Sequence, residues 1–301
     1  MTLNSDLKSS DNPKEWTSWA LTWFISMCIL ATGNLAICFK LYVLSPRSVS
    51  KGTLSPTWKL TVIFTFVCAY RSYFPTIYLS RSCFVESGVS GILLARLMAF
   101  VGELCWMVQV ANSLKVVNRA LSRSPAVNVL ANFVVVLISM AECFSTYATV
   151  TKNSLFFTLE EGSWVVAGVT CITPALFILV RAYRRVEDPS RRDPMIRLYL
   201  TIFVGFMFVY DIWGVSTDVR SNWNRYIEER DEVPSPWLDF HTGLDQVTGL
   251  CNLDRSWETW SGYLLWMTGY FSLGVWSSLA LSILVLPEKS ASAAPSEPLL
   301  V

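Results

Sequence analysis

Seven long apolar segments are the feature that most constrains the fold of this 301-residue chain. Each has about the 20 residues that an α-helix needs to cross the hydrocarbon core of a bilayer. Lipid offers the backbone no hydrogen-bond partners, so segments of this length must be helical. The sequence therefore predicts an all-α polytopic membrane protein, a bundle of seven transmembrane helices. The predicted spans are 19–44, 60–79, 92–114, 127–150, 164–183, 198–217 and 260–286.

The composition agrees with this class and excludes others. Charged residues make up 16% of the chain, whereas about a quarter is usual in soluble domains. The net charge of +1 and the lack of a basic run give no support for a nucleic-acid partner. The single histidine, His241, excludes sites that need two or three His ligands. We expect no metal, no cofactor and no catalytic residue.

The Lys and Arg residues at the ends of the spans and in the loops and tails predict the orientation. Fourteen lie on one side of the membrane and eight on the other, and the excess marks the cytosolic side. This distribution places the N-terminus outside or in a lumen and the C-terminus in the cytosol. The protein would then contact the lipid bilayer of the plasma membrane or of an endomembrane, and the sequence does not choose between them.

The chain divides into one transmembrane domain and two tails. We expect a polar external tail at 1–15, the seven-helix domain at 16–286 and a disordered cytosolic tail at 287–301. A long external loop, 218–258, joins the last two spans. Cys83 and Cys251 fall on this same external side, either as a disulfide or as two free thiols.

Five charged residues lie inside the predicted spans, and they are the candidates for ligand or proton binding. Counting 1.5 Å per residue, they lie roughly 6–16 Å from the external ends of their helices. Similar depths predict that Arg71 pairs with Glu103 or Glu142. They also predict that Arg96 pairs with Asp211. Ionisable residues inside the membrane indicate function by default, and the alternative is that these pairs only fix the helix order. The five are Arg71, Arg96, Glu103, Glu142 and Asp211.

The same charges predict a polar cavity that opens to the external side. In it the two arginines would hold an anionic group, and a carboxyl would carry a proton. Tyr263, Trp266 and Tyr270 follow one another at three- and four-residue steps, so they could form an aromatic wall of the cavity. Pro75 is expected to kink the second span near Arg71.

Three functions remain open at this point. The first is a proton-coupled or small-solute transporter, with a small anionic solute. The second is a receptor or ligand-binding protein without transport, whose basic loop 181–197 would meet a cytosolic partner or anionic lipid. The third is an intramembrane enzyme that uses paired carboxylates. It is the least favoured, because the chain shows no metal ligand set and no nucleophile–base motif.

Overall fold

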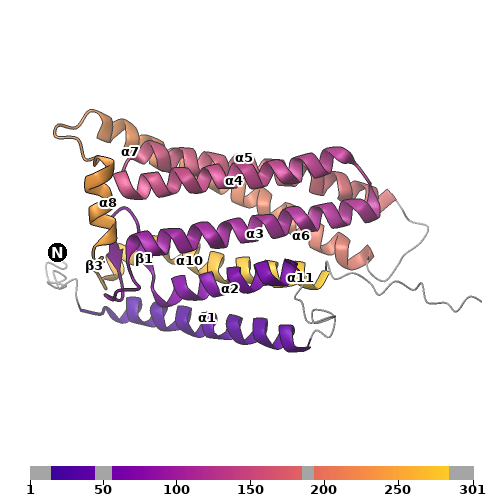
Figure 1. Ribbon diagram of the computed structural model, residues 1–301, viewed down its shortest axis with the longest axis horizontal. Helices are drawn as coiled ribbons and strands as arrows, with labels where there is room; N and C mark the ends of the chain where they lie inside the picture. Colours follow the sequence, from indigo (N-terminus) through magenta and orange to yellow (C-terminus); the bar gives the residue numbers. More distant parts are fainter. Residues whose placement is uncertain (1–14, 45–55, 185–192, 285–301) are drawn as a thin grey trace, which may run out of the picture.

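Long helices run side by side along the length of the molecule in the computed structural model, which describes residues 15–44, 56–184 and 193–284 (Figure 1). The helices of the first half are α1 (Ser18–Leu44), α2 (Pro56–Tyr73), α3 (Ile92–Leu121), α4 (Pro125–Thr151) and α5 (Ser154–Arg184). Those of the second half are α6 (Asp193–Trp213), α7 (Arg220–Arg230), α8 (Phe240–Thr248), α9 (Trp257–Trp260), α10 (Leu264–Gly269) and α11 (Val275–Leu284). Two π-helical turns, Gly214–Val219 and Tyr270–Gly274, and a 3-10 turn, Ser261–Tyr263, join helices of the second half end to end.

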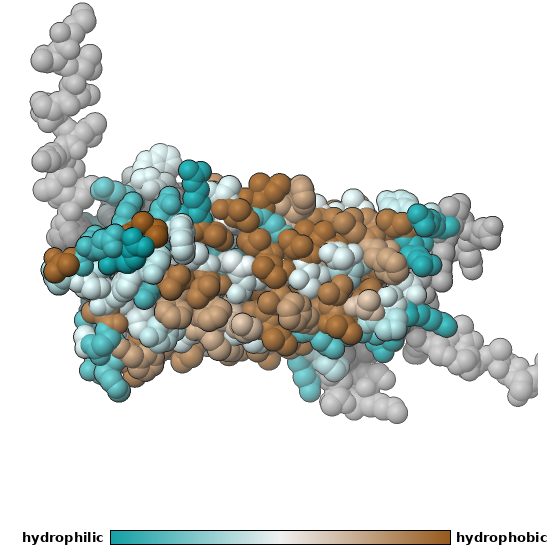
Figure 2. Space-filling view, turned by 90° about the horizontal axis from the view of Figure 1, so that it is seen from above, coloured by the Kyte–Doolittle hydropathy of each residue, from teal (hydrophilic) through white to brown (hydrophobic). Residues whose placement is uncertain are grey.

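Six segments of the described chain are long and apolar enough to cross a membrane. Figure 2 shows apolar side chains over the middle of the molecule and polar ones at both ends, as a membrane protein requires. The helix α2 is not among the six, although it packs against α1 and α3. The six segments are Ser18–Val43, Ile92–Arg119, Pro125–Thr151, Ser154–Arg184, Arg197–Arg230 and Trp257–Ile283.

Short connections make α3, α4 and α5 antiparallel neighbours. Between α3 and α4, the Asn118 amide donates to the Ser124 carbonyl oxygen at 2.8 Å and accepts from the Ser124 amide at 3.0 Å. Pro125 then opens α4, where its missing N–H costs no helical hydrogen bond. At the other end of α4, Lys152 takes a left-handed conformation with φ 58° and turns the chain into α5. These turns bring residues of the three helices to similar depths.

Several helix boundaries differ from the predicted spans. The helix α2 ends at Tyr73 and not at residue 79, because Pro75 ends the helix and does not kink it. The helix α5 begins at Ser154, ten residues before the predicted span, so that Glu160 and Glu161 lie inside it. Residues 220–230 fall in the predicted external loop 218–258, but they form α7, which continues α6 through a π-helical turn.

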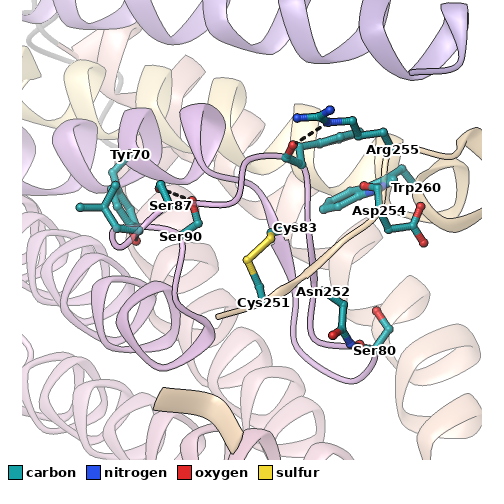
Figure 3. Close-up of a disulfide and its surroundings, with 12 residues drawn as sticks. Tyr70, Ser80, Cys83, Ser87, Ser90, Cys251, Asn252, Asp254, Arg255 and Trp260 are labelled. Atoms are coloured by element: carbon teal, nitrogen blue, oxygen red, sulfur yellow. Dashed lines mark hydrogen bonds between the residues drawn. A yellow bond between two sulfur atoms is a disulfide. The ribbon is translucent and has the colours of Figure 1, made fainter. Parts of the chain in front are cut away.

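The external loop is tied to the helix ends by a small sheet and a disulfide. The strands β1 (Thr76–Ile77), β2 (Ser82–Cys83) and β3 (Asn252–Leu253) pair in that order. Cys83 and Cys251 are joined by a disulfide across 168 residues of chain (Figure 3). This end of the molecule, which also holds α8, is called the disulfide end below. Of the two alternatives that the sequence left open for these cysteines, a disulfide or two free thiols, the structure has the disulfide.

Backbone contacts fix α8 across the end of α4 (Figure 1). The Leu238 amide donates to the Thr151 carbonyl oxygen at 2.9 Å, and Gly243 packs directly on the Val150 carbonyl oxygen. A side chain at Gly243 would overlap that oxygen. Arg81 also donates to the Val150 carbonyl oxygen, at 3.1 Å. The chain between α7 and α9 therefore closes the disulfide end of the bundle.

An aromatic cluster lies beside the disulfide. The Phe84 ring stacks on Trp260 with centroids 4.0 Å apart and on Trp16 at 5.2 Å. The Arg255 side chain donates to the Phe84 carbonyl oxygen at 3.2 Å (Figure 3). These contacts connect the segment after β2 to α1 and α9. Residues 1–14 and 287–301 of the predicted tails lie outside the described residues, as do 285–286 and residues 185–192 of the basic loop 181–197.

Candidate functional site

Four helices contribute charged side chains to one buried group, which we call the charged cluster: Arg71, Arg96, Glu103, Glu142 and Glu160. Arg71 donates to Glu103 at 3.3 Å, which is one of the two pairings that depth predicted. Arg96 and Glu103 lie seven residues apart on α3, so both face the same side of the helix. Glu103 Oε2 lies 3.7 Å from Arg96, so this carboxylate joins the two arginines.

Arg96 is the centre of the cluster. It donates to Glu142 on α4 and forms an ion pair with Glu160 on α5, with Nη1 and Oε1 3.6 Å apart. Glu160 precedes the predicted span 164–183 and was not a candidate. Glu160 lies six residues after Ser154, where α5 begins. A helix that begins at Ser154 brings Glu160 to the depth of Arg96, and this spacing is the signal in the sequence that could have identified it.

Aromatic rings surround the Arg71 guanidinium. Its Cζ lies 5.5 Å from the centroid of Trp266, 5.7 Å from Tyr270 and 5.1 Å from Phe271. The Trp266 and Tyr270 rings stack with centroids 5.3 Å apart. Such cation–π contacts stabilise a guanidinium that has been taken out of water. Two residues of the predicted aromatic wall are therefore in contact with the cluster.

Tyr263, the third predicted member of that wall, lies apart from it. Its side chain is 37% exposed and interacts with Arg225. The 3-10 turn Ser261–Tyr263 and the π-helical turn after Gly269 interrupt the regular helix, so the three- and four-residue steps do not keep one face. Phe271 takes the third place at Arg71.

Tyr78 covers the cluster at the disulfide end. It lies in the connection between β1 and β2, and its hydroxyl accepts from Arg71 at 3.2 Å. Arg96 lies 5.5 Å from the centroid of its ring. Burial raises the pKa of the Tyr78 phenol by more than the two arginines lower it. The net pKa is above the ordinary value, so the hydroxyl stays neutral. Tyr78 was absent from the sequence-based candidates because only charged residues were selected in the first six predicted spans.

The cluster is closed to solvent. Arg96 is 2% exposed, Glu103 is 5% exposed and Glu142 is fully buried. Two polar atoms inside it lack a hydrogen-bond partner, Arg96 Nε and Glu142 Oε1. The cavity expected to open towards the outside is therefore covered in this conformation, with Tyr78 as part of the cover.

Asp211 is not part of the cluster, which corrects the predicted pairing with Arg96. It lies on α6 with its carboxyl group against Gly168 of α5. Both of its oxygens are buried and lack a hydrogen-bond partner. The helix α3 packs against α2, α4 and α5, whereas α6 packs against α5. Equal depth on two helices that are not neighbours does not bring their side chains together.

Comparisons with protein-family models, with curated proteins and with solved structures find no match to this chain. Within the described residues, no group of His, Cys, Asp and Glu side chains is arranged to hold a metal ion. A proposal for the function must therefore rest on the chemistry of the charged cluster. Its groups can carry charge and exchange a proton.

Proposed function

We propose that this membrane protein is a proton-coupled transporter in which the charged cluster is the proton-binding site. The observation that carries the proposal is the charge balance of the cluster. Two guanidinium groups face three carboxyl groups, Glu103, Glu142 and Glu160, in a region closed to water. An uncompensated buried charge costs several kcal/mol or more, so one carboxyl group of the three must hold a proton.

The geometry supports a proton shared by Glu103 and Glu142. Oε2 of both residues faces the same nitrogen, Arg96 Nη2, so the two carboxyl groups meet at one guanidinium, and carboxylate oxygens can only accept. A proton between them supplies the missing donor, and Glu142 Oε1 has no other partner. Such a pair binds and releases its proton as a unit, not as two independent residues.

The contacts of the arginines argue against the anionic solute first considered. Arg96 already faces three carboxyl groups, and Arg71 faces Glu103, Tyr78 and three rings. An anion would have to displace these partners. A proton, with a neutral or cationic solute, fits the excess of carboxyl groups better.

The proposal includes seven spans, with α2 as the seventh, and the disulfide end outside or in a lumen. Disulfides persist in oxidising compartments, which supports this orientation for Cys83 and Cys251. The helix α2 lies between α1 and α3 and carries Arg71 into the buried cluster, so it is enclosed with the spans.

The test is proton flux through the purified full-length chain in sealed phosphatidylcholine vesicles with an imposed proton gradient. Wild-type protein should acidify or alkalinise the lumen faster than empty vesicles. Glu142→Gln, which keeps the shape of the side chain and removes the exchangeable proton, should abolish this flux.

The matched control is Glu258→Gln, on α9, where the side chain is exposed. Its flux should equal that of the wild type. Equal flux in Glu142→Gln and wild type, or no flux from correctly folded wild-type protein under any solute gradient applied, would refute the proposal.

A further inference from the structure

A second ionisable group lies in the apolar part of the bundle, away from the charged cluster. Asp211 is 7% exposed, and neither oxygen of its carboxyl group has a hydrogen-bond partner. No ion pair joins it to any described residue. The titratable side chain that interacts with it is Cys171 of α5, a neutral thiol, and Tyr210 is its neighbour on α6.

Asp211 fills a space that glycine leaves open between α5 and α6. A Cβ at Gly168 would overlap the Asp211 carboxyl group. Three residues further along the chain, where the π-helical turn after α6 begins, a Cβ at Gly214 would lie 3.2 Å from Val165 of α5. Each helix thus places one side chain over a glycine of the other, at matching three-residue spacing. The two helices approach closely at this point, and the carboxyl group is enclosed by their contact.

An ionised carboxylate in this position would be an uncompensated charge in the hydrocarbon region. The cost of such a charge far exceeds the cost of holding a proton, so the neutral acid is the stable form. The segment that follows, Gly214–Val219, is π-helical, and a π-helical turn inside a membrane helix is a place where the backbone can rearrange.

We propose that Asp211 is a second proton-binding site and that its proton holds α6 against α5. Loss of the proton places a bare charge between Asp211 and Gly168, so the carboxylate must turn out of the contact or the helices must separate. The π-helical turn lies within one helical turn of Asp211 and can absorb that movement. This inference does not depend on the proposed function of the charged cluster.

The decisive measurement is the infrared spectrum of the full-length protein in phosphatidylcholine vesicles at neutral pH. The protein is prepared with ¹³C in the aspartate side-chain carboxyl groups. The carboxyl groups of the charged cluster all belong to glutamates, which do not carry this label. A protonated carboxylic acid band that shifts with the label therefore comes from an aspartate. We expect one such band, and we expect Asp211→Asn to remove it.

The matched control is Asp245→Asn, because Asp245 is exposed on α8. That substitution should remove carboxylate bands and leave the acid band unchanged. If the labelled wild type shows no aspartic acid band, or if Asp211→Asn removes carboxylate bands instead, Asp211 is ionised and the proposal is wrong. The spectrum of the labelled wild type needs no variant, so it tests the proposal even if Asp211→Asn does not fold.

The role in helix packing has its own measurement. The melting temperature of the wild type should fall as the pH rises from about 4, the ordinary pKa of an aspartate, and should level off where the acid band disappears, because over that range folding requires the carboxyl group to take up a proton. Asp211→Asn, which cannot ionise, should show a smaller fall, and what remains comes from the protonated carboxyl group of the charged cluster. A melting temperature that falls equally in both proteins would overturn the coupling between the proton and the contact of α5 with α6.

Discussion

Arg96 is the residue on which the charged cluster depends most. Its guanidinium group faces Glu103, Glu142 and Glu160, whereas Arg71 forms an ion pair with Glu103 alone among the described residues. A buried ion pair adds little net stability, but removing one partner leaves a buried charge without compensation. The cluster should therefore tolerate the loss of a carboxyl group better than the loss of Arg96.

Arg96→Met should lower the free energy of unfolding by about 3–5 kcal/mol, because Met keeps the volume but leaves the carboxyl groups unpaired. Thermal unfolding in detergent measures this. Adding Glu142→Gln to Arg96→Met should restore part of the loss, since one unpaired carboxyl group is removed. The exposed Arg181→Met is the matched control and should change little. Wild-type stability in Arg96→Met would show that the pairs are not formed.

The pairing of Arg71 with Glu103 is one of the two that the sequence left open, and the predicted pairing of Arg96 with Asp211 is not formed. Depth along a helix can be counted from the sequence, at 1.5 Å per residue. The neighbours of a helix in the bundle cannot be counted in this way. Asp211 lies on α6, behind α5, whereas Glu160 was assigned to the wrong side of a boundary.

At the level of the elements, α2 packs closely on α3 where α3 has a glycine, Gly102. A Cβ at Gly102 would lie 2.7 Å from Val67 Cγ1, closer than two carbon atoms can pack. Glu103 follows Gly102 directly and reaches Arg71 on α2. The close contact of the two helices therefore helps to set the distance across the ion pair.

Gly102→Ala should lower the free energy of unfolding by about 1–3 kcal/mol, because the branched Val67 side chain cannot move away without strain. Gly33→Ala is the matched control, since nothing lies within 4 Å of the Cβ position on α1. Alanine favours helix over glycine by up to about 1 kcal/mol, so the control should be neutral or slightly stabilised. Chemical or thermal unfolding compares the two. Equal effects of both substitutions would mean that α2 and α3 are further apart.

The length of the apolar segments predicts that the helices exist. It does not always predict where they begin and end. The first turns of α5 contain polar residues, including Glu160 and Glu161, which hydropathy assigns to a loop. They are helical because they face the inside of the bundle, where Glu160 meets Arg96. The π-helical turn Tyr270–Gly274 similarly breaks the period on which the aromatic wall was predicted.

At the scale of the whole molecule, the two ends differ in chemistry. One end holds the disulfide, the small sheet and α8, and the other holds the short connection of α3 to α4 with Arg123. Together with the distribution of Lys and Arg, this difference predicts that the disulfide end is external or lumenal. The covered side of the charged cluster would then face outwards.

Two single cysteines test that orientation in a protein whose six free cysteines are replaced and whose disulfide is kept. Val233→Cys lies between α7 and α8, where the native side chain is 96% exposed, and Arg123→Cys lies at the opposite end. In intact cells or right-side-out vesicles, a membrane-impermeant maleimide should label Val233→Cys. Arg123→Cys should react only after the membrane is made permeable. The reverse pattern would invert the orientation and place the Tyr78 cover on the cytosolic side. Labelling of both sites from one side would require an even number of spans between residues 123 and 233, and so would contradict the seven-helix arrangement.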